Sequence, residues 1–149
     1  MVGEEDILAA MERQLECYQR LAKLADVQRE HVQQGDAEAL LGVLQRRQGV
    51  LDELSQLERV VAPIKQEWPA FTQSLAGDRR EHVEAMMLRS RQLLEQITRS
   101  DQDDVMLLQQ RKLNVGKQIN QASASRQVNR AYATSAYGNR TSGNMDLSR

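Results

Sequence analysis

Aromatic residues are scarce in this chain: one Trp, one Phe and three Tyr make up 3% of its 149 residues. Any core must therefore be built mainly from Leu, Met, Val, Ile and Ala, the residues that are typical of helical bundles. The chain also has a single cysteine, Cys17, so a disulfide scaffold is excluded. Because Cys17 lies between Leu15 and Tyr18 and has no basic residue nearby, we expect it to pack in the core rather than to act as a nucleophile.

Long apolar runs are absent as well. No run approaches the roughly 18 residues that a bilayer-spanning helix needs. The N-terminal residues Glu4, Glu5 and Asp6 occupy the place where a secretory signal would be basic. We therefore expect a cytoplasmic protein without membrane insertion.

Residues arranged for catalysis or metal binding are also lacking. His31 and His82 have no second ligand at a suitable spacing, which argues against a zinc site. The densest acidic cluster, Asp101, Asp103 and Asp104, lacks the loop glycine and the terminal Glu of a calcium loop, so we interpret it as a solvated helix face or a helix cap. We predict no catalytic residue, no cofactor, no metal and no enzyme activity.

Three series of apolar residues, each stepping three and four positions, are present instead, and this period is helical. The first series predicts a helix over 5–34, ended by Gly35, with Asp36 capping the next helix. The second predicts a helix over 36–61, ended by Pro63. The first series comprises Leu8, Met11, Leu15, Tyr18, Ala22, Ala25 and Val32, widened by Ile7 and Leu21; the second comprises Leu40, Leu44, Leu51, Leu54 and Val61, widened by Val43, Val50 and Leu57.

Two glycines lie on the opposite face of the second helix. Gly42 and Gly49 are seven residues apart, and each costs up to about 1 kcal/mol relative to Ala in a helix interior. We interpret them as tolerated exposed glycines; the alternative is that they admit a close-packed neighbour.

The third series follows a connector at 62–77, which we expect to contain one or two helical turns. We expect its Trp68 and Phe71 to plug the end of the bundle. Asp78 and Glu81 form a capping-box pattern for a helix over 78–121. Leu93 and Leu107 are two heptads apart, which favours one continuous helix through Ser100–Asp104; the alternative is a new helix capped at Ser100 or Asp101. Its apolar pairs are Met86/Met87, Leu93/Leu94 and Leu107/Leu108, with Val115 and Ile119 beyond.

These patterns predict an all-α protein: a bundle over 1–121 made of an antiparallel helical hairpin plus a long third helix, in a three-helix or coiled-coil-like arrangement. A flexible polar and basic tail, 122–149, follows. Charge divides the chain earlier, because residues 1–104 contain 13 basic and 20 acidic residues and residues 105–149 contain 7 basic and 1 acidic.

The third helix is predicted to be longer than its partners, so its last apolar residues lack an internal cover. Such an uncovered stripe usually marks a partner surface. Nearby basic residues would select partners with acidic flanks, and the tail around Tyr132 is expected to add a helical turn when a partner is present. The predicted partner-binding residues are Leu107, Leu108, Arg111, Lys112, Val115, Ile119 and Tyr132.

Two runs and the tail resemble the FlgN-like flagellar export chaperones. The runs are residues 33–41, QQGDAEALL, and residues 47–54, RQGVLDEL, similar to the family's Gly-Asp turn followed by a leucine-rich helix. The tail has Tyr132 and Tyr137-Gly138, similar to the tyrosine-glycine ending of these proteins. The resemblance covers nearly the whole chain.

The resemblance implies a cytoplasmic chaperone of flagellar type III export. Such a chaperone binds the C-terminal helical region of hook-associated (hook-filament junction) proteins, prevents their premature assembly and delivers them to the export apparatus. The family's client-binding region is its C-terminal helix, which maps here onto Leu107, Leu108, Val115 and Ile119.

Two other classes of function remain as alternatives. One is a structural coiled-coil protein that closes its stripe by homo-oligomerisation and has no client. The other is a nucleic-acid adaptor using the tail arginines Arg126, Arg130 and Arg140. The acidic body would repel a polyanion, so we expect no nucleic-acid partner.

Overall fold

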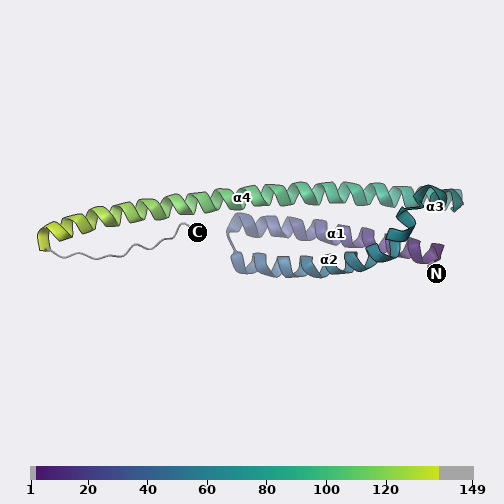
Figure 1. Cartoon of the computed structure of the whole chain (residues 1–149), viewed down its shortest axis with the longest axis horizontal. Coiled ribbons are helices and arrows are strands. Elements are labelled where there is room, and N and C mark those ends of the chain that lie inside the picture. The colour runs from purple at the N-terminus through teal and green to yellow at the C-terminus, as the bar shows by residue number, and fades with distance from the viewer. Residues whose placement is uncertain (1–2, 138–149) are drawn as a thin grey trace. The chain divides into compact units, whose positions relative to one another are not determined.

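The computed structural model describes residues 3–137, apart from the side chains of Val115, Ser125 and residues 127–137. This part of the chain forms four helices and no strands: α1 (Glu4–Gln34), α2 (Ala37–Lys65), α3 (Trp68–Ser74) and α4 (Gly77–Tyr137) (Figure 1). The predicted all-α class is confirmed. The chain divides into two units, Met1–Asp104 and Val105–Arg149.

The turn between α1 and α2 is made by two residues with specific roles. Gly35 has a φ of 70°, in the left-handed region that disfavours residues with a Cβ. Its N–H and that of Asp36 donate to the carbonyls of Val32 and His31, at 3.2 and 3.1 Å. The Asp36 carboxylate accepts from the N–H of Ala39 at 3.0 Å and so caps α2. The sequence prediction for this turn is confirmed.

Replacing glycines at the turn and within α2 is expected to have opposite effects. Gly35→Ala should destabilise the protein by about 1 kcal/mol, because Ala in the left-handed region is strained. Gly49→Ala should stabilise it by up to about 1 kcal/mol, because a Cβ there has no atom within 4 Å and Ala is the better helix former. Urea unfolding followed by circular dichroism measures both; equal effects of the two variants would contradict the assignment of Gly35.

The C-terminal ends of two helices differ from the sequence prediction. Helix α2 continues through Pro63 to Lys65, although the proline has no N–H to donate to the carbonyl four residues earlier. The predicted connector contains the short helix α3, in agreement with the one or two helical turns expected there. Helix α4 runs without a break through Ser100–Asp104, as the heptad spacing favours, and continues beyond Gln121 to Tyr137 because neither glycine nor proline interrupts that stretch. The rest of the predicted tail, 138–149, lies outside the described residues.

The core of the first unit consists of two clusters, each with residues from α1, α2 and α4. Trp68 and Phe71 of α3 pack against the first cluster, with their ring centroids 5.5 Å apart, as predicted for the residues that plug the bundle end. The first cluster contains Ile7, Ala10, Met11, Val61, Leu75, Val83 and Met86. The second contains Cys17, Leu21, Ala22, Val50, Leu54, Leu93 and Ile97.

The buried face of α2 is rotated from the one predicted. Val43 and Val50 are buried, whereas Leu44 and Leu51 are 46% and 43% exposed. The prediction that Leu44 and Leu51 form the centre of the seam is therefore wrong. Adjacent apolar residues satisfy the same three-and-four spacing, so the sequence pattern does not decide which of the two lines faces the core.

Candidate partner-binding surface

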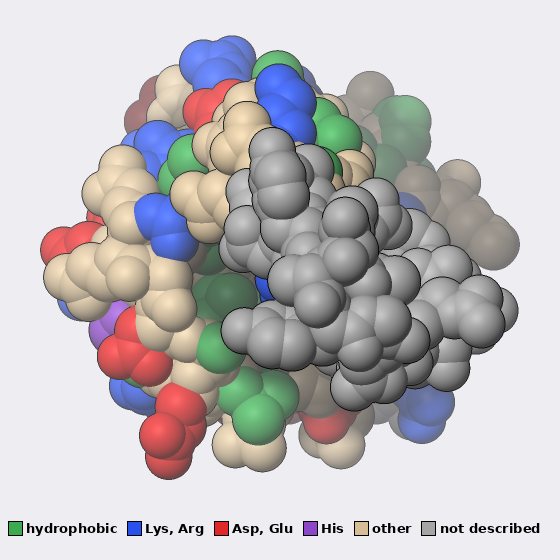
Figure 2. All heavy atoms as spheres, turned by 90° about the vertical axis from the view of Figure 1, so that its left-hand side faces the viewer, with side chains coloured by type: hydrophobic (Ala, Val, Ile, Leu, Met, Phe, Trp, Pro, Cys, Tyr) green, Lys and Arg blue, Asp and Glu red, His purple; other side chains and the backbone are tan. Residues whose placement is uncertain are grey.

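The second unit contributes the C-terminal part of α4, and its large apolar side chains are open to solvent. Val105, Met106, Leu108 and Leu113 are 52%, 67%, 42% and 61% exposed. Leu107 is half-buried, and so is Ile119. On the face of the molecule drawn in Figure 2, hydrophobic side chains reach the surface between charged side chains of both signs.

The predicted site residues lie mostly on one side of α4. At 100° per residue, the positions from Leu107 to Ile119 that were predicted to bind a partner fall within an arc of about 140°. Met106 and Leu113 are seven residues apart and fall on the opposite side of the helix. The surface formed by Leu107, Leu108, Arg111, Lys112 and Ile119 is called the α4 stripe below. Of the other two predicted residues, Val115 and Tyr132, the helix backbone is described but the side chains are not.

The α4 stripe is basic. Lys112 is exposed and Arg111 half-buried, and Lys117 follows as another exposed cation. Residues 105–137 contain no Asp or Glu, so the charged side chains of this stretch of sequence are all positive. A partner with acidic side chains beside an apolar face complements such a surface.

Sequence reasoning missed two apolar residues of this region. Val105 and Met106 directly precede the Leu107/Leu108 pair and are strongly exposed. The signal was the unbroken run of four apolar residues from Val105 to Leu108, which covers every side of a helix and not one stripe. One docked helix therefore covers only part of the apolar surface of this segment.

The acidic cluster before the stripe has a structural role. Asp104 is 1% exposed; its carboxylate accepts from Gln28 Nε2 at 2.9 Å and from Arg29 Nε at 3.3 Å. The prediction that this cluster is a solvated face or a cap is therefore wrong for Asp104. Its partners come from α1, far away in the sequence, so the local pattern could not reveal that it is buried.

A second ion pair joins α2 to the same part of α4. Arg47 donates two hydrogen bonds of 2.7 Å to the two carboxylate oxygens of Asp101, and a third of 2.7 Å to Gln28 Oε1. The hydrogen bonds that Arg47 donates to Asp101 raise the pKa of its guanidinium, although burial opposes the shift. These contacts form a polar layer that joins α1, α2 and α4 in the first unit. The layer consists of Gln28, Arg29, Arg47, Asp101 and Asp104.

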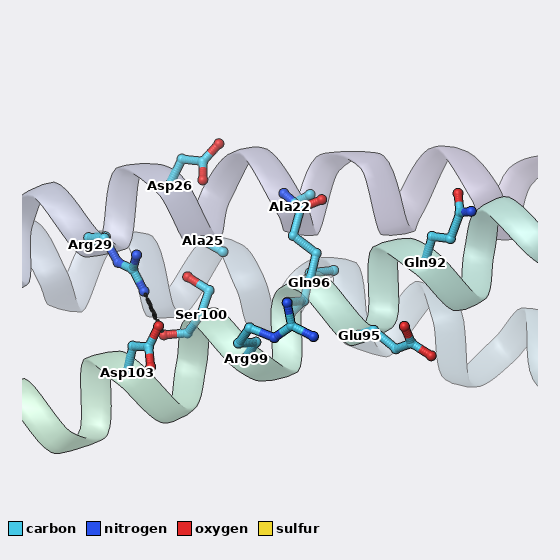
Figure 3. Close-up of a pocket in the computed structure, with 11 residues that line it drawn as sticks. Ala22, Ala25, Asp26, Arg29, Gln92, Glu95, Gln96, Arg99, Ser100 and Asp103 are labelled. Carbon is cyan, nitrogen blue, oxygen red and sulfur yellow. Dashed lines mark hydrogen bonds and ion pairs between the residues drawn. The ribbon is translucent and has the colours of Figure 1, made fainter.

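A groove of about 450 Å³ lies beside this layer, between α1 and α4 (Figure 3). The small side chains of Ala22 and Ala25 leave the space open. Its rim carries charges of both signs, and Figure 3 shows Arg29 directed toward Asp103, with which it forms an ion pair of 3.3 Å. This mixture gives the groove no preference for a ligand of one charge. The charged lining residues are Asp26, Arg29, Glu95, Arg99 and Asp103.

Cys17 is buried between α1 and α2, as predicted, but the expectation that it has no basic residue nearby is wrong, because the charges of Arg13 and Arg20 act on its thiol. Its Sγ donates to Glu53 Oε2 at 2.7 Å, and Arg13 donates to the other oxygen of Glu53 at 2.7 Å. Burial, and then the hydrogen bond to Glu53, raise the pKa of Cys17 to about 11. The hydrogen bonds from Arg13 and Cys17 lower the pKa of Glu53. The thiol is therefore held protonated, which is opposite to what a nucleophile needs.

We expect Cys17 to react with Ellman's reagent at pH 8 at least about 100 times more slowly in the folded protein than in 8 M urea. Because the folded state raises the thiol pKa, the thiol's contribution to stability is fully present below pH 9 and is lost as the pH rises toward 11. Stopped-flow absorbance gives the reaction rates, and urea unfolding at pH 8 and 10.5 gives the stabilities. Equal reaction rates in the two states would contradict the buried, protonated thiol.

The described residues contain neither a metal-binding cluster nor a helix that could span a membrane. No three or more His, Cys, Asp and Glu within 3–137 are grouped so that they could hold a metal ion. His82 Nε2 lies 3.2 Å from Glu12 Oε1, with both side chains more than half exposed. None of the described helices has a stretch long and apolar enough to cross a membrane.

Comparisons with known protein families, with curated proteins and with solved structures find no match to this chain. The resemblance to the FlgN-like chaperones therefore stays a prediction from the residues that carry it. The exposed surfaces of α4 are the feature that bears on function.

Proposed function

We propose that this protein is a cytoplasmic export chaperone of the flagellar type III pathway. In this proposal α1 and α2 form an antiparallel hairpin that packs on the first part of the long helix α4. The later part of α4 binds the C-terminal helical region of hook-associated proteins, prevents their premature assembly and presents them to the export apparatus. The protein has no enzymatic role in this process.

The observation that carries the proposal is the partial exposure of the apolar residues of the α4 stripe, in which Leu108 is 42% exposed and Leu107 and Ile119 are half-buried. A soluble helix rarely leaves a run of large apolar residues uncovered unless a partner covers it. An amphipathic client helix would bury its apolar face there, which contributes about 25 cal/mol per Å² of apolar surface less the cost of ordering the client. Lys112 and Lys117 favour a client helix with acidic flanks.

Self-association is a second candidate, favoured by exposed leucines in the first unit. Leu41, Leu44 and Leu51 of α2 are 57%, 46% and 43% exposed, and Leu94 of α4 is 42% exposed. A homo-oligomer would cover these residues without any client. Its melting temperature would rise with protein concentration.

Size-exclusion chromatography with light scattering tests the proposal on the full-length chain. We expect a defined complex when the protein is mixed with a C-terminal helical fragment of a hook-associated protein, and no complex with a fragment from its N-terminal region. A tight oligomer that ignores the C-terminal fragment would contradict the chaperone proposal and support the structural bundle.

A further inference from the structure

The outer side of the α1–α2 pair has a second groove, distinct from the α4 stripe and from the groove in Figure 3. It has a volume of about 520 Å³. Its lining contains four cations and a single carboxylate, in a unit whose overall balance is acidic. The lining residues are Arg13, Arg20, Lys23, Leu24, Arg46, Gly49, Val50 and Glu53.

The cations of this groove are only partly neutralised. Arg13 pairs with Glu53 and Glu16 at 2.7 Å each, and Arg20 lies 3.9 Å from Glu53. Lys23 and Arg46 form no ion pair within the described part of the chain. The groove therefore presents an excess of positive charge to a ligand.

The floor between these cations is apolar. Leu24 is half-buried, Val50 is 5% exposed, and a Cβ added at Gly49 would meet no atom within 4 Å. A partner backbone can therefore approach α2 closely at Gly49. Basic rims beside an apolar floor complement a helix with an apolar stripe and acidic flanks.

The spacing of the cations favours a helix over a polyanion. Arg13 and Arg20 are seven residues apart on α1, about 10 Å along the helix axis, which is also the heptad repeat of a helix packed alongside. The groove has no aromatic side chain on which a base could stack. A helix in this position would complete a four-helix bundle.

We propose that the α1–α2 groove binds an acidic amphipathic helix of another protein. Arg20, Lys23 and Arg46 contact the acidic flanks, while Leu24 and Val50 contact the apolar stripe. This site shares no residue with the α4 stripe.

The test uses a synthetic 21-residue helix with leucine on one face and glutamate at seven-residue intervals on both flanks. Its binding to the full-length protein is measured by fluorescence anisotropy at low salt. We expect Arg20→Glu/Arg46→Glu to weaken binding at least about tenfold, because both contacts become repulsive. Gly49→Leu should weaken it similarly by filling the floor while leaving every charge in place. Circular dichroism shows whether each variant stays folded.

Matched controls separate the groove from general electrostatics and from the α4 stripe. Arg59→Glu/Arg91→Glu carries the same charge change at exposed positions outside the groove and should leave binding unchanged. A lysine version of the peptide should not bind. Leu108→Asp/Ile119→Asp changes only the α4 stripe and should leave the glutamate peptide bound in the α1–α2 groove. Failure of the chaperone proposal and failure of this one are therefore distinguishable.

Several results would overturn the proposal. They are no binding of the glutamate peptide, an equal loss in the control variant, or unchanged binding in both groove variants. If a single-stranded oligonucleotide or vesicles containing phosphatidylglycerol bind with the same variant pattern, the site takes polyanions and not a helix. If the protein is a dimer that the groove variants dissociate, the occupant is a second copy.

Discussion

Replacing Asp104 by Ala is expected to destabilise the protein by about 2–4 kcal/mol, one of the two largest effects that we predict. The carboxylate is 1% exposed and accepts hydrogen bonds from Gln28 and Arg29. Gln28 is itself only 7% exposed, so its amide would be left buried with one partner fewer. Urea unfolding followed by circular dichroism should show a lower midpoint with a similar slope.

The neighbouring carboxylate provides a matched control. Asp103 pairs with Arg29 at 3.3 Å but its side chain is 59% exposed. Asp103→Ala should therefore change stability by no more than about 0.5 kcal/mol. If the two variants lose equal stability, the burial of Asp104 is not what makes the polar layer important.

The second large effect concerns client binding. Leu108→Asp/Ile119→Asp should weaken binding of a hook-associated C-terminal fragment by at least about 100-fold, because two apolar contacts are lost and two charges are placed in the interface. Isothermal titration calorimetry with the full-length protein measures this loss. The first unit should keep its urea midpoint, since neither residue belongs to its core.

A control of the same chemistry lies on the opposite side of the helix. Met106→Asp/Leu113→Asp introduces the same two charges at positions that are 67% and 61% exposed. The two pairs differ by only a few tenths of a kcal/mol in helix propensity, about the difference between Ile and Met, so a larger difference in binding reports the face and not the stability of the helix. Equal losses would contradict the assignment of the client site to the α4 stripe.

Local signals in the sequence were sufficient for much of the fold. The Gly35-Asp36 turn is determined by one left-handed residue and one cap, and both are readable from residue type. The continuity of α4 followed from the two-heptad spacing of Leu93 and Leu107. These features depend on residues close together in the chain.

The features that could not be predicted depend on distant partners. Asp104 is buried because Gln28 and Arg29 reach it from α1, and no pattern near Asp104 records that contact. The face that α2 buries was ambiguous because a valine stands directly before a leucine at 43/44 and again at 50/51, so two apolar lines run side by side along the helix. The basic groove was missed because its cations come from two helices and are outnumbered by acidic residues in the surrounding sequence.

The polar layer also affects the entropy cost of ordering the part of α4 to which a partner would bind. Starting a helix is costly, with a nucleation constant on the order of 10⁻³, whereas adding a residue to an existing helix is nearly neutral. Because α4 is one helix from Gly77 to Tyr137, and its turn at Asp104 is anchored by side chains from α1, the residues that follow extend a nucleus already formed. The entropy cost of starting this helix is therefore met when the first unit folds. A partner that binds to α4 after Asp104 does not have to nucleate it.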